Sequence, residues 1–69
     1  MKKFSQRLKE LRLAKGISQK ELAKLLNTTN SSVCDWECER SEPSIEVLIF
    51  LAKYFDVTCD YLLGASDYL

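Results

Sequence analysis

The chain has no histidine, and only three of its 69 residues are cysteines. A zinc site needs four ligands, and no histidine is present to complete one. The odd cysteine count argues against a disulfide framework, and a bridge between Cys34 and Cys38, four residues apart, would strain a helix. We therefore expect reduced cysteines, no metal and no cofactor. A redox role stays open, but the neighbouring Asp35 and Glu37 would not lower a thiol pKa.

Long apolar runs are also missing. The longest, residues 47–52, is far shorter than the roughly 20 residues that span a bilayer. Residues 1–6 lack the apolar core of a signal peptide, so we expect a cytoplasmic protein. Residues 1–69 are expected to form one domain, with a core over about 4–64 and a short tail over 65–69. A domain of this size leaves little room for an enclosed catalytic cavity, and no activated nucleophile is apparent, which argues against an enzyme.

The chain has no excess of charge of either sign, but its two parts differ. Residues 1–24 carry eight basic and two acidic side chains, a net +6, and residues 25–69 carry two basic and eight acidic ones, a net −6. Two solvated faces would explain this asymmetry. A basic surface that faces phosphate and an acidic surface turned away from it would explain it equally well.

Helical periodicity predicts an all-α fold of five helices. The first spans residues 3–15, stops at Gly16, and presents one apolar face made of Phe4, Leu8, Leu11 and Ala14. Ser44 is expected to cap the fourth helix, whose core face would hold Ile45, Leu48, Leu51, Ala52 and Phe55. Thr58 is expected to cap a short fifth helix that runs through Leu63 and stops at Gly64.

Residues 18–36 predict the remaining two helices, joined by a tight turn. Ser18 and Glu21 form a capping box at the start of the second helix, and Asn27 tolerates the left-handed backbone at its end. Thr29 can cap the third helix, whose buried face offers Val33 and Trp36. Two short helices in this arrangement can place the later one in a DNA major groove.

The chain resembles the lambda-repressor-like, or Cro/XRE, helix-turn-helix family over about residues 4–64. The resemblance rests on residues 11–12, 15–23, 26, 33, 36–37, 42–44, 48, 51–52 and 57–64. It implies a five-helix fold in which the second and third helices form the helix-turn-helix. It also implies sequence-specific binding to double-stranded DNA and regulation of transcription, and we expect repression by a homodimer.

The resemblance implies roles for individual residues. The base contacts would come from Gln19, Asn30, Ser31, Ser32 and Asp35, and Gln19 and Arg40 would contact phosphate. Gln19 would also support the recognition helix. Apart from the resemblance, the helix start at Gln19 with Lys20 and Lys24 nearby suits a phosphate, and Thr29 and the Trp36 indole N–H are further phosphate candidates. Arg12 and Glu37 would form a buried ion pair. Asparagine can bond the edge of adenine with two hydrogen bonds, which favours Asn30 for base discrimination. Residues 30–32 would also suit a helix start with no DNA role.

Two features depart from the family pattern. The recognition helix carries no Arg or Lys, and Asp35, Glu37 and Glu39 lie on or beside it. Phosphate repulsion should therefore weaken non-specific affinity, so the first helix, the Gln19 end and a second subunit would have to supply affinity. Glu39 stands where the family usually has glycine, which predicts strain or a longer helix.

A second apolar stripe on the fourth helix suggests where a second subunit would bind. The dimer candidates are Val47, Phe50, Tyr54, Tyr61, Tyr68 and Leu69. The same aromatics could lie singly on the surface or cover one another. The rival function is a protein-interaction module, such as an antitoxin or anti-repressor, that keeps the fold and binds a protein through this stripe. DNA binding should fall steeply with salt, whereas an apolar interface should not.

Overall fold

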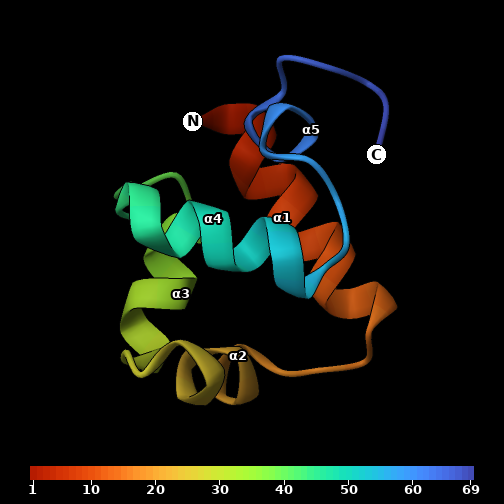
Figure 1. The fold of residues 1–69 in the computed structure, drawn as a ribbon. Helices are drawn as coiled ribbons and strands as arrows, with labels where there is room; N and C mark the ends of the chain where they lie inside the picture. The colour runs from red at the N-terminus through yellow and green to blue at the C-terminus, as the bar shows by residue number, and fades with distance from the viewer.

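The computed structural model describes residues 1–69 as five helices and no strand. These are α1 (Lys2–Ala14), α2 (Gln19–Leu26), α3 (Asn30–Glu37), α4 (Ile45–Tyr54) and α5 (Cys59–Leu63) (Figure 1). Helix α3 packs against α1 and α2, and α5 packs against α1 and α4. Both chain ends lie beside α5, on the far side of the molecule from α2 (Figure 1). None of the helices has the length and apolar character needed to cross a membrane.

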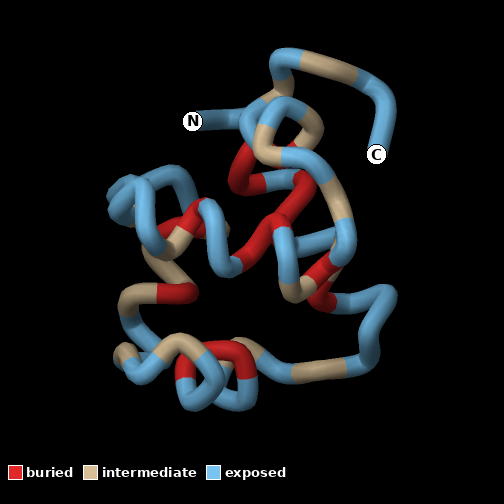
Figure 2. Tube along the Cα trace, in the orientation of Figure 1, coloured by how far each residue is buried: buried red, intermediate tan, exposed pale blue.

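One apolar core joins all five helices. It consists of Phe4, Leu8, Leu22, Ala23, Val33, Trp36, Leu48, Leu51, Ala52, Phe55 and Leu62. The buried stretches of the chain turn toward the centre of the molecule (Figure 2). Two predicted core residues are wrong: Ala14 is exposed, and Ile45 is 75% exposed. Each lies at one end of its helix, beyond the part that packs on the core, although it is on the core-facing side by helical periodicity.

The four predicted N-terminal caps are confirmed. The hydroxyls of Ser18, Thr29, Ser44 and Thr58 each accept a hydrogen bond from the backbone N–H three residues later. At Ser18 the box is reciprocal, because its own N–H donates to the Glu21 carboxylate over 2.9 Å. These hydrogen bonds hold the pKa of Glu21 below its usual value.

A left-handed residue follows each helix. Its φ is 72° at Gly16, 56° at Asn27, 63° at Glu39, 56° at Asp56 and 86° at Gly64. Only two of the five are glycine, although a side chain in this region costs roughly 1–2 kcal/mol. Gly64 is also required by space, because a Cβ there would lie 2.5 Å from the Cβ of Lys3.

Replacing Glu39 with glycine is expected to stabilise the protein by about 1 kcal/mol, because glycine adopts φ near +60° without steric cost. Helix α3 does end at Glu37, so strain at Glu39 rather than a longer helix is what the structure shows. Urea denaturation measures the change. Glu39→Ala removes the charge but keeps the Cβ, so it should give no comparable gain. Equal gains in both variants would show that charge, not backbone strain, is the cause.

Candidate nucleic-acid interface

A tight reversal brings α2 and α3 together at the candidate site. Asn27 adopts φ 56° and ψ 45°, and the next N–H, of Thr28, donates to the carbonyl of Ala23 over 2.9 Å. Asn30 begins α3 directly after the cap at Thr29. The turn therefore leaves the first residues of α3 exposed at the surface.

A buried carboxylate joins α1, α2 and α3. Glu37 accepts two hydrogen bonds from Arg12, at 2.7 and 3.1 Å, and a third from the amide of Gln19 at 3.1 Å. The Arg12 and Glu37 side chains are only 9% and 3% exposed. The hydrogen bonds with Glu37 raise the pKa of Arg12 further above its usual value. Arg12 also donates to the Ile17 carbonyl over 2.8 Å. The implied ion pair is thus present, and it fixes α3 against the other two helices.

Gln19 supports the recognition helix, as the resemblance implies, and its contact with DNA stays a prediction. Its amide nitrogen is held by Glu37, and its side chain is half-buried. This arrangement leaves the amide oxygen and the second N–H of the amide for contact with a ligand. Gln19 therefore positions α2 against α3 in addition to any role at the surface.

Trp36 lies in the core, and its carbonyl accepts a hydrogen bond from the hydroxyl of Ser5 on α1. The sequence patterns gave no signal for Ser5, which is a buried serine that ties α1 to the end of α3. The indole N–H of Trp36 donates no hydrogen bond within the chain, yet no buried polar side-chain atom lacks a partner. That N–H therefore keeps some contact with solvent, although Trp36 as a whole is only 6% exposed.

The residues implied as base contacts differ in how free they are. Asn30 and Ser31 are exposed, and neither side chain bonds to the rest of the protein. Ser32 is half-buried, and its hydroxyl lies 3.0 Å from the hydroxyl of Thr29. Thr29 also accepts from the Ser32 N–H. Asn30 and Ser31 are consequently the two side chains most available to a ligand. The hydroxyls of Thr29 and Ser32 are already hydrogen-bonded to each other.

Asp35 and Arg40 form an ion pair across the end of α3. The Arg40 Nη1 and Asp35 Oδ1 atoms are 3.6 Å apart, and the side chains are 69% and 41% exposed. The left-handed Glu39 folds the chain back, so that the Arg40 N–H donates to the Asp35 carbonyl over 2.9 Å. An exposed pair of this kind contributes about 0–1 kcal/mol, so Arg40 can leave Asp35 for a phosphate at little cost.

Helix α2 supplies further positive charge. Lys20 and Lys24 are both exposed and belong to no ion pair in the chain. Unpaired N–H groups and the positive end of the helix dipole lie at the start of α2, an arrangement suited to phosphate. The cations therefore flank α3 from α2 and from Arg40, because α3 itself has none.

The predicted dimer residues on α4 are partly covered within the chain. Val47 and Tyr54 are half-buried and pack against the core, while Phe50 is 41% exposed. The Phe50 and Tyr54 rings are stacked with centroids 6.1 Å apart, and the Lys15 Nζ lies 4.5 Å from the Tyr54 ring centre. Mutual covering of these aromatics, which the sequence left open, is thus part of the fold.

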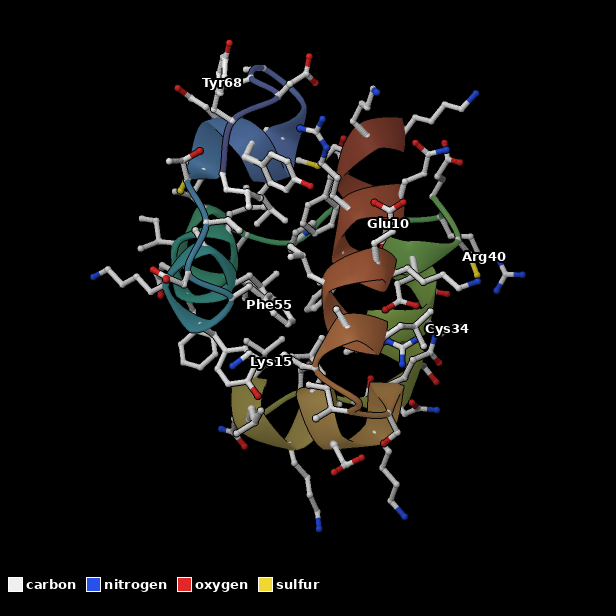
Figure 3. All side chains as sticks on the ribbon, turned by 90° about the vertical axis from the view of Figure 1, so that its right-hand side faces the viewer. Glu10, Lys15, Cys34, Arg40, Phe55 and Tyr68 are labelled. Atoms are coloured by element: carbon white, nitrogen blue, oxygen red, sulfur yellow. The ribbon has the colours of Figure 1, made fainter.

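The other three dimer candidates lie elsewhere. Arg7, only 8% exposed, stacks over the Tyr61 ring and bonds to the tail at the Ser66 carbonyl (2.7 Å) and the Asp67 carboxylate (2.9 Å). Tyr68, in that tail, stands at the opposite end of the molecule from Lys15 (Figure 3). The six candidates therefore do not form one surface, and the Arg7 clamp on the tail had no sequence signal.

The largest apolar exposure on α4 is on another side of the helix. Ile45 is 75% exposed and Ile49 is 44% exposed, and they lie one turn apart beside Phe50. Phe55, at the end of the same helix, points instead into the space between α4 and α1 (Figure 3). The i, i+4 spacing of the two isoleucines was the available signal, but Ile45 was assigned to the core.

Comparison with known proteins agrees with this geometry. Residues 8–62 match the helix-turn-helix family. The chain is 45% identical over 58 residues to the transcriptional regulator AnsR of Bacillus subtilis, covering 84% of this chain and 50% of that protein. It thus spans about half the length of curated relatives such as AnsR and ImmR.

Two solved structures share the fold. The restriction-modification controller protein C.AhdI from Aeromonas hydrophila superposes with a TM-score of 0.76 and 39% identity, covering 88% of both chains. The P22 c2 repressor, solved in complex with a synthetic operator, gives a TM-score of 0.84 and 29% identity over 96% of this chain and 100% of that one. This chain therefore belongs to the Cro/C1-type (XRE) helix-turn-helix family of DNA-binding transcriptional regulators and has the lambda-repressor-like fold.

Proposed function

We propose that the chain is a cytoplasmic, sequence-specific repressor that binds double-stranded operator DNA as a homodimer. The observation that carries this proposal is the start of α3, where Asn30 and Ser31 stand exposed and unpaired on a helix fixed by the buried Glu37. Rigid support of this kind favours a site that must present side chains in a set geometry. A solved relative, the P22 c2 repressor, is bound to operator DNA, which supports the same role here.

Base readout is assigned mainly to Asn30, with Ser31 beside it. An asparagine amide can both donate to and accept from adenine, whereas a serine hydroxyl discriminates little between bases. Asp35 can accept from a cytosine amino group once Arg40 has turned to a phosphate. Ser32 reads a base only if its hydroxyl leaves Thr29.

Phosphate contacts are assigned to the cations around α3. Lys20, Lys24 and Arg40 are exposed, and the Gln19 amide, Thr29 and the Trp36 indole N–H are assigned further polar contacts. Affinity then comes from the rim of the site and discrimination from α3.

Asn30→Ala is expected to reduce discrimination at one base position by about 1–3 kcal/mol, because one bidentate contact is lost. A binding assay on operators randomised at single positions measures this loss. Gln6→Ala, an exposed polar change on α1, is the control and should leave the preference profile intact. A profile for Asn30→Ala that matches the parent at every position would remove Asn30 from base readout.

A second subunit is proposed because one copy offers few phosphate contacts. Ile45, Ile49 and Phe50 are apolar side chains on α4 that are exposed to solvent, and their burial against another protein would be favourable. We place the dimer contact there, with Val47 and Tyr54 supporting it from below. Tyr61 serves its own chain through Arg7, and Tyr68 and Leu69 are assigned only a peripheral contact. The two recognition helices should then lie about 34–36 Å apart, one turn of DNA.

Phe50→Glu and Ile49→Glu are each expected to convert the dimer to monomer, because a charge would be buried in an apolar contact. Sedimentation equilibrium gives the mass directly. Leu13→Glu is the matched control, since Leu13 is 58% exposed on α1, outside the proposed surface. Tyr54→Glu is a poorer test because Tyr54 packs against the core. An unchanged dimer mass in both test variants would exclude this face of α4 as the interface.

A further inference from the structure

Two of the three cysteines form a pair at the end of the recognition helix. Cys34 lies on α3 and Cys38 caps it, and their sulfur atoms are 3.8 Å apart. Both are free thiols; Cys34 is half-buried and Cys38 is exposed. Cys34 lies at the same edge of the molecule as Arg40 (Figure 3). The pair is therefore open to solvent and next to groups assigned above to DNA.

We propose that Cys34 and Cys38 together bind one soft monovalent metal ion of the Cu(I) class as two thiolates. A metal–thiolate bond is about 2.3 Å long, so two bonds in line span about 4.6 Å. The sulfur atoms are now 3.8 Å apart, so the proposed site requires the two side chains to rotate until that distance is reached.

The number of ligands selects the class of ion. Thiolate sites favour Cu(I), zinc and iron–sulfur clusters. Zinc takes three or four protein ligands and the clusters take four, and the chain holds no group of three or more metal-binding side chains. Cu(I) is the member of this set for which a pair of thiolates is sufficient.

A disulfide suits the geometry less well. It needs Cβ atoms about 3.8 Å apart, whereas residues four apart on a helix hold them about 5–6 Å apart. Closing the bridge would distort the last turn of α3, where Glu37 is held by Arg12. A bridging ion fills the gap between the sulfurs instead.

Acidic side chains surround the cysteine pair. Asp35, Glu37 and Glu39 lie in the same short segment, and Arg40, the one nearby cation beyond the buried Arg12, is drawn to Asp35. Binding releases the two thiol protons to solvent while Cu(I) takes their place, with no change of oxidation state. The site therefore passes from neutral to a net charge of −1.

The added charge gives the site a regulatory consequence, which rests on the proposed DNA binding. One more negative charge beside Asp35 and Arg40 repels the phosphates that Arg40 is assigned to contact. Loading should therefore weaken operator binding by about five-fold or more, within the range of ordinary allosteric couplings.

The first test measures the ion without DNA. The full, reduced chain is titrated anaerobically with Cu(I) held by a competing coloured chelator. One ion per chain is expected, with capture abolished in Cys34→Ser and in Cys38→Ser but retained in Cys59→Ser, the matched control on α5. Circular dichroism shows whether each variant is folded. No competition with the chelator, capture retained in either pair variant, or one ion per two chains would overturn the site.

The second test measures operator binding of Cys59→Ser with and without Cu(I). A loss of affinity on loading that is absent in the Cys34→Ser, Cys59→Ser double variant is expected. Equal affinity with and without the ion would overturn the regulatory consequence. Because ion capture is measured separately, a protein that binds Cu(I) but no DNA would contradict the proposed function and not the metal site.

Discussion

Arg12→Met is expected to lower the free energy of unfolding by about 3–5 kcal/mol, because it leaves the Glu37 carboxylate buried without its cation. Glu37 would keep only the hydrogen bond from Gln19, and its side chain is 3% exposed. Urea denaturation measures the change. Lys20→Met is the control, because an exposed lysine without an ion pair should change stability by about 0.5 kcal/mol or less.

A double variant separates loss of an ion pair from loss of packing. In Arg12→Met, Glu37→Met neither charge remains, so much of the stability lost in the single variant should return. Equal effects of Arg12→Met and Lys20→Met would contradict a buried pair. A double variant no more stable than Arg12→Met would show that packing of the arginine stem, rather than the unpaired charge, accounts for the loss.

Operator affinity is expected to fall by about 10³-fold between 50 and 200 mM salt, which corresponds to about six neutralised phosphates. Lys20, Lys24 and Arg40 on each of two subunits supply that number. Fluorescence anisotropy with a labelled operator measures the slope of log affinity against log salt. Lys24→Met should reduce the slope by about 2, one contact for each subunit.

The control for the salt series is Lys3→Met, an exposed lysine near the start of α1 that lies beside Gly64, away from the candidate interface. It should leave the slope unchanged. Affinity that is insensitive to salt would contradict binding through phosphates. Salt-insensitive association with a protein, together with no operator binding, would favour the interaction-module alternative.

Local signals made much of the fold predictable. Ser18 with Glu21, Asn27 and Thr29 act on backbone groups within a few residues, so their effect does not depend on the rest of the chain. Helical periodicity likewise placed Phe4 and Leu8 in the core. It failed at Ile45, because periodicity gives the side of a helix and not how far the core extends along it.

Contacts between segments far apart in the sequence were harder to predict. The Arg12–Glu37 pair came from family resemblance, since nothing local links residues 25 apart. Arg7 and Ser5 bind backbone carbonyls, which any sequence offers, so no pattern marks them.

Local signals also made part of the candidate site predictable. The place of Asn30 and Ser31 at the start of α3 follows from the Thr29 cap, but their role as base contacts came from the family resemblance and stays a prediction. The engagement of Ser32 with Thr29 was predictable in principle from a cap three residues away, but the exposed hydroxyl was assigned to DNA. The grouping of Tyr54 with Tyr68 as dimer candidates stays a prediction, because the surface that each joins depends on how α4 and the tail pack.

Selection of bound sequences from a random pool of double-stranded DNA tests sequence-specific recognition by α3 most directly. We predict enrichment of a pseudo-palindromic motif whose half-sites lie about 10–10.5 base pairs apart. Asn30→Ala should alter that motif at one symmetric pair of positions. A pool that stays unenriched at low salt, with folded protein, would contradict sequence-specific DNA binding by this chain.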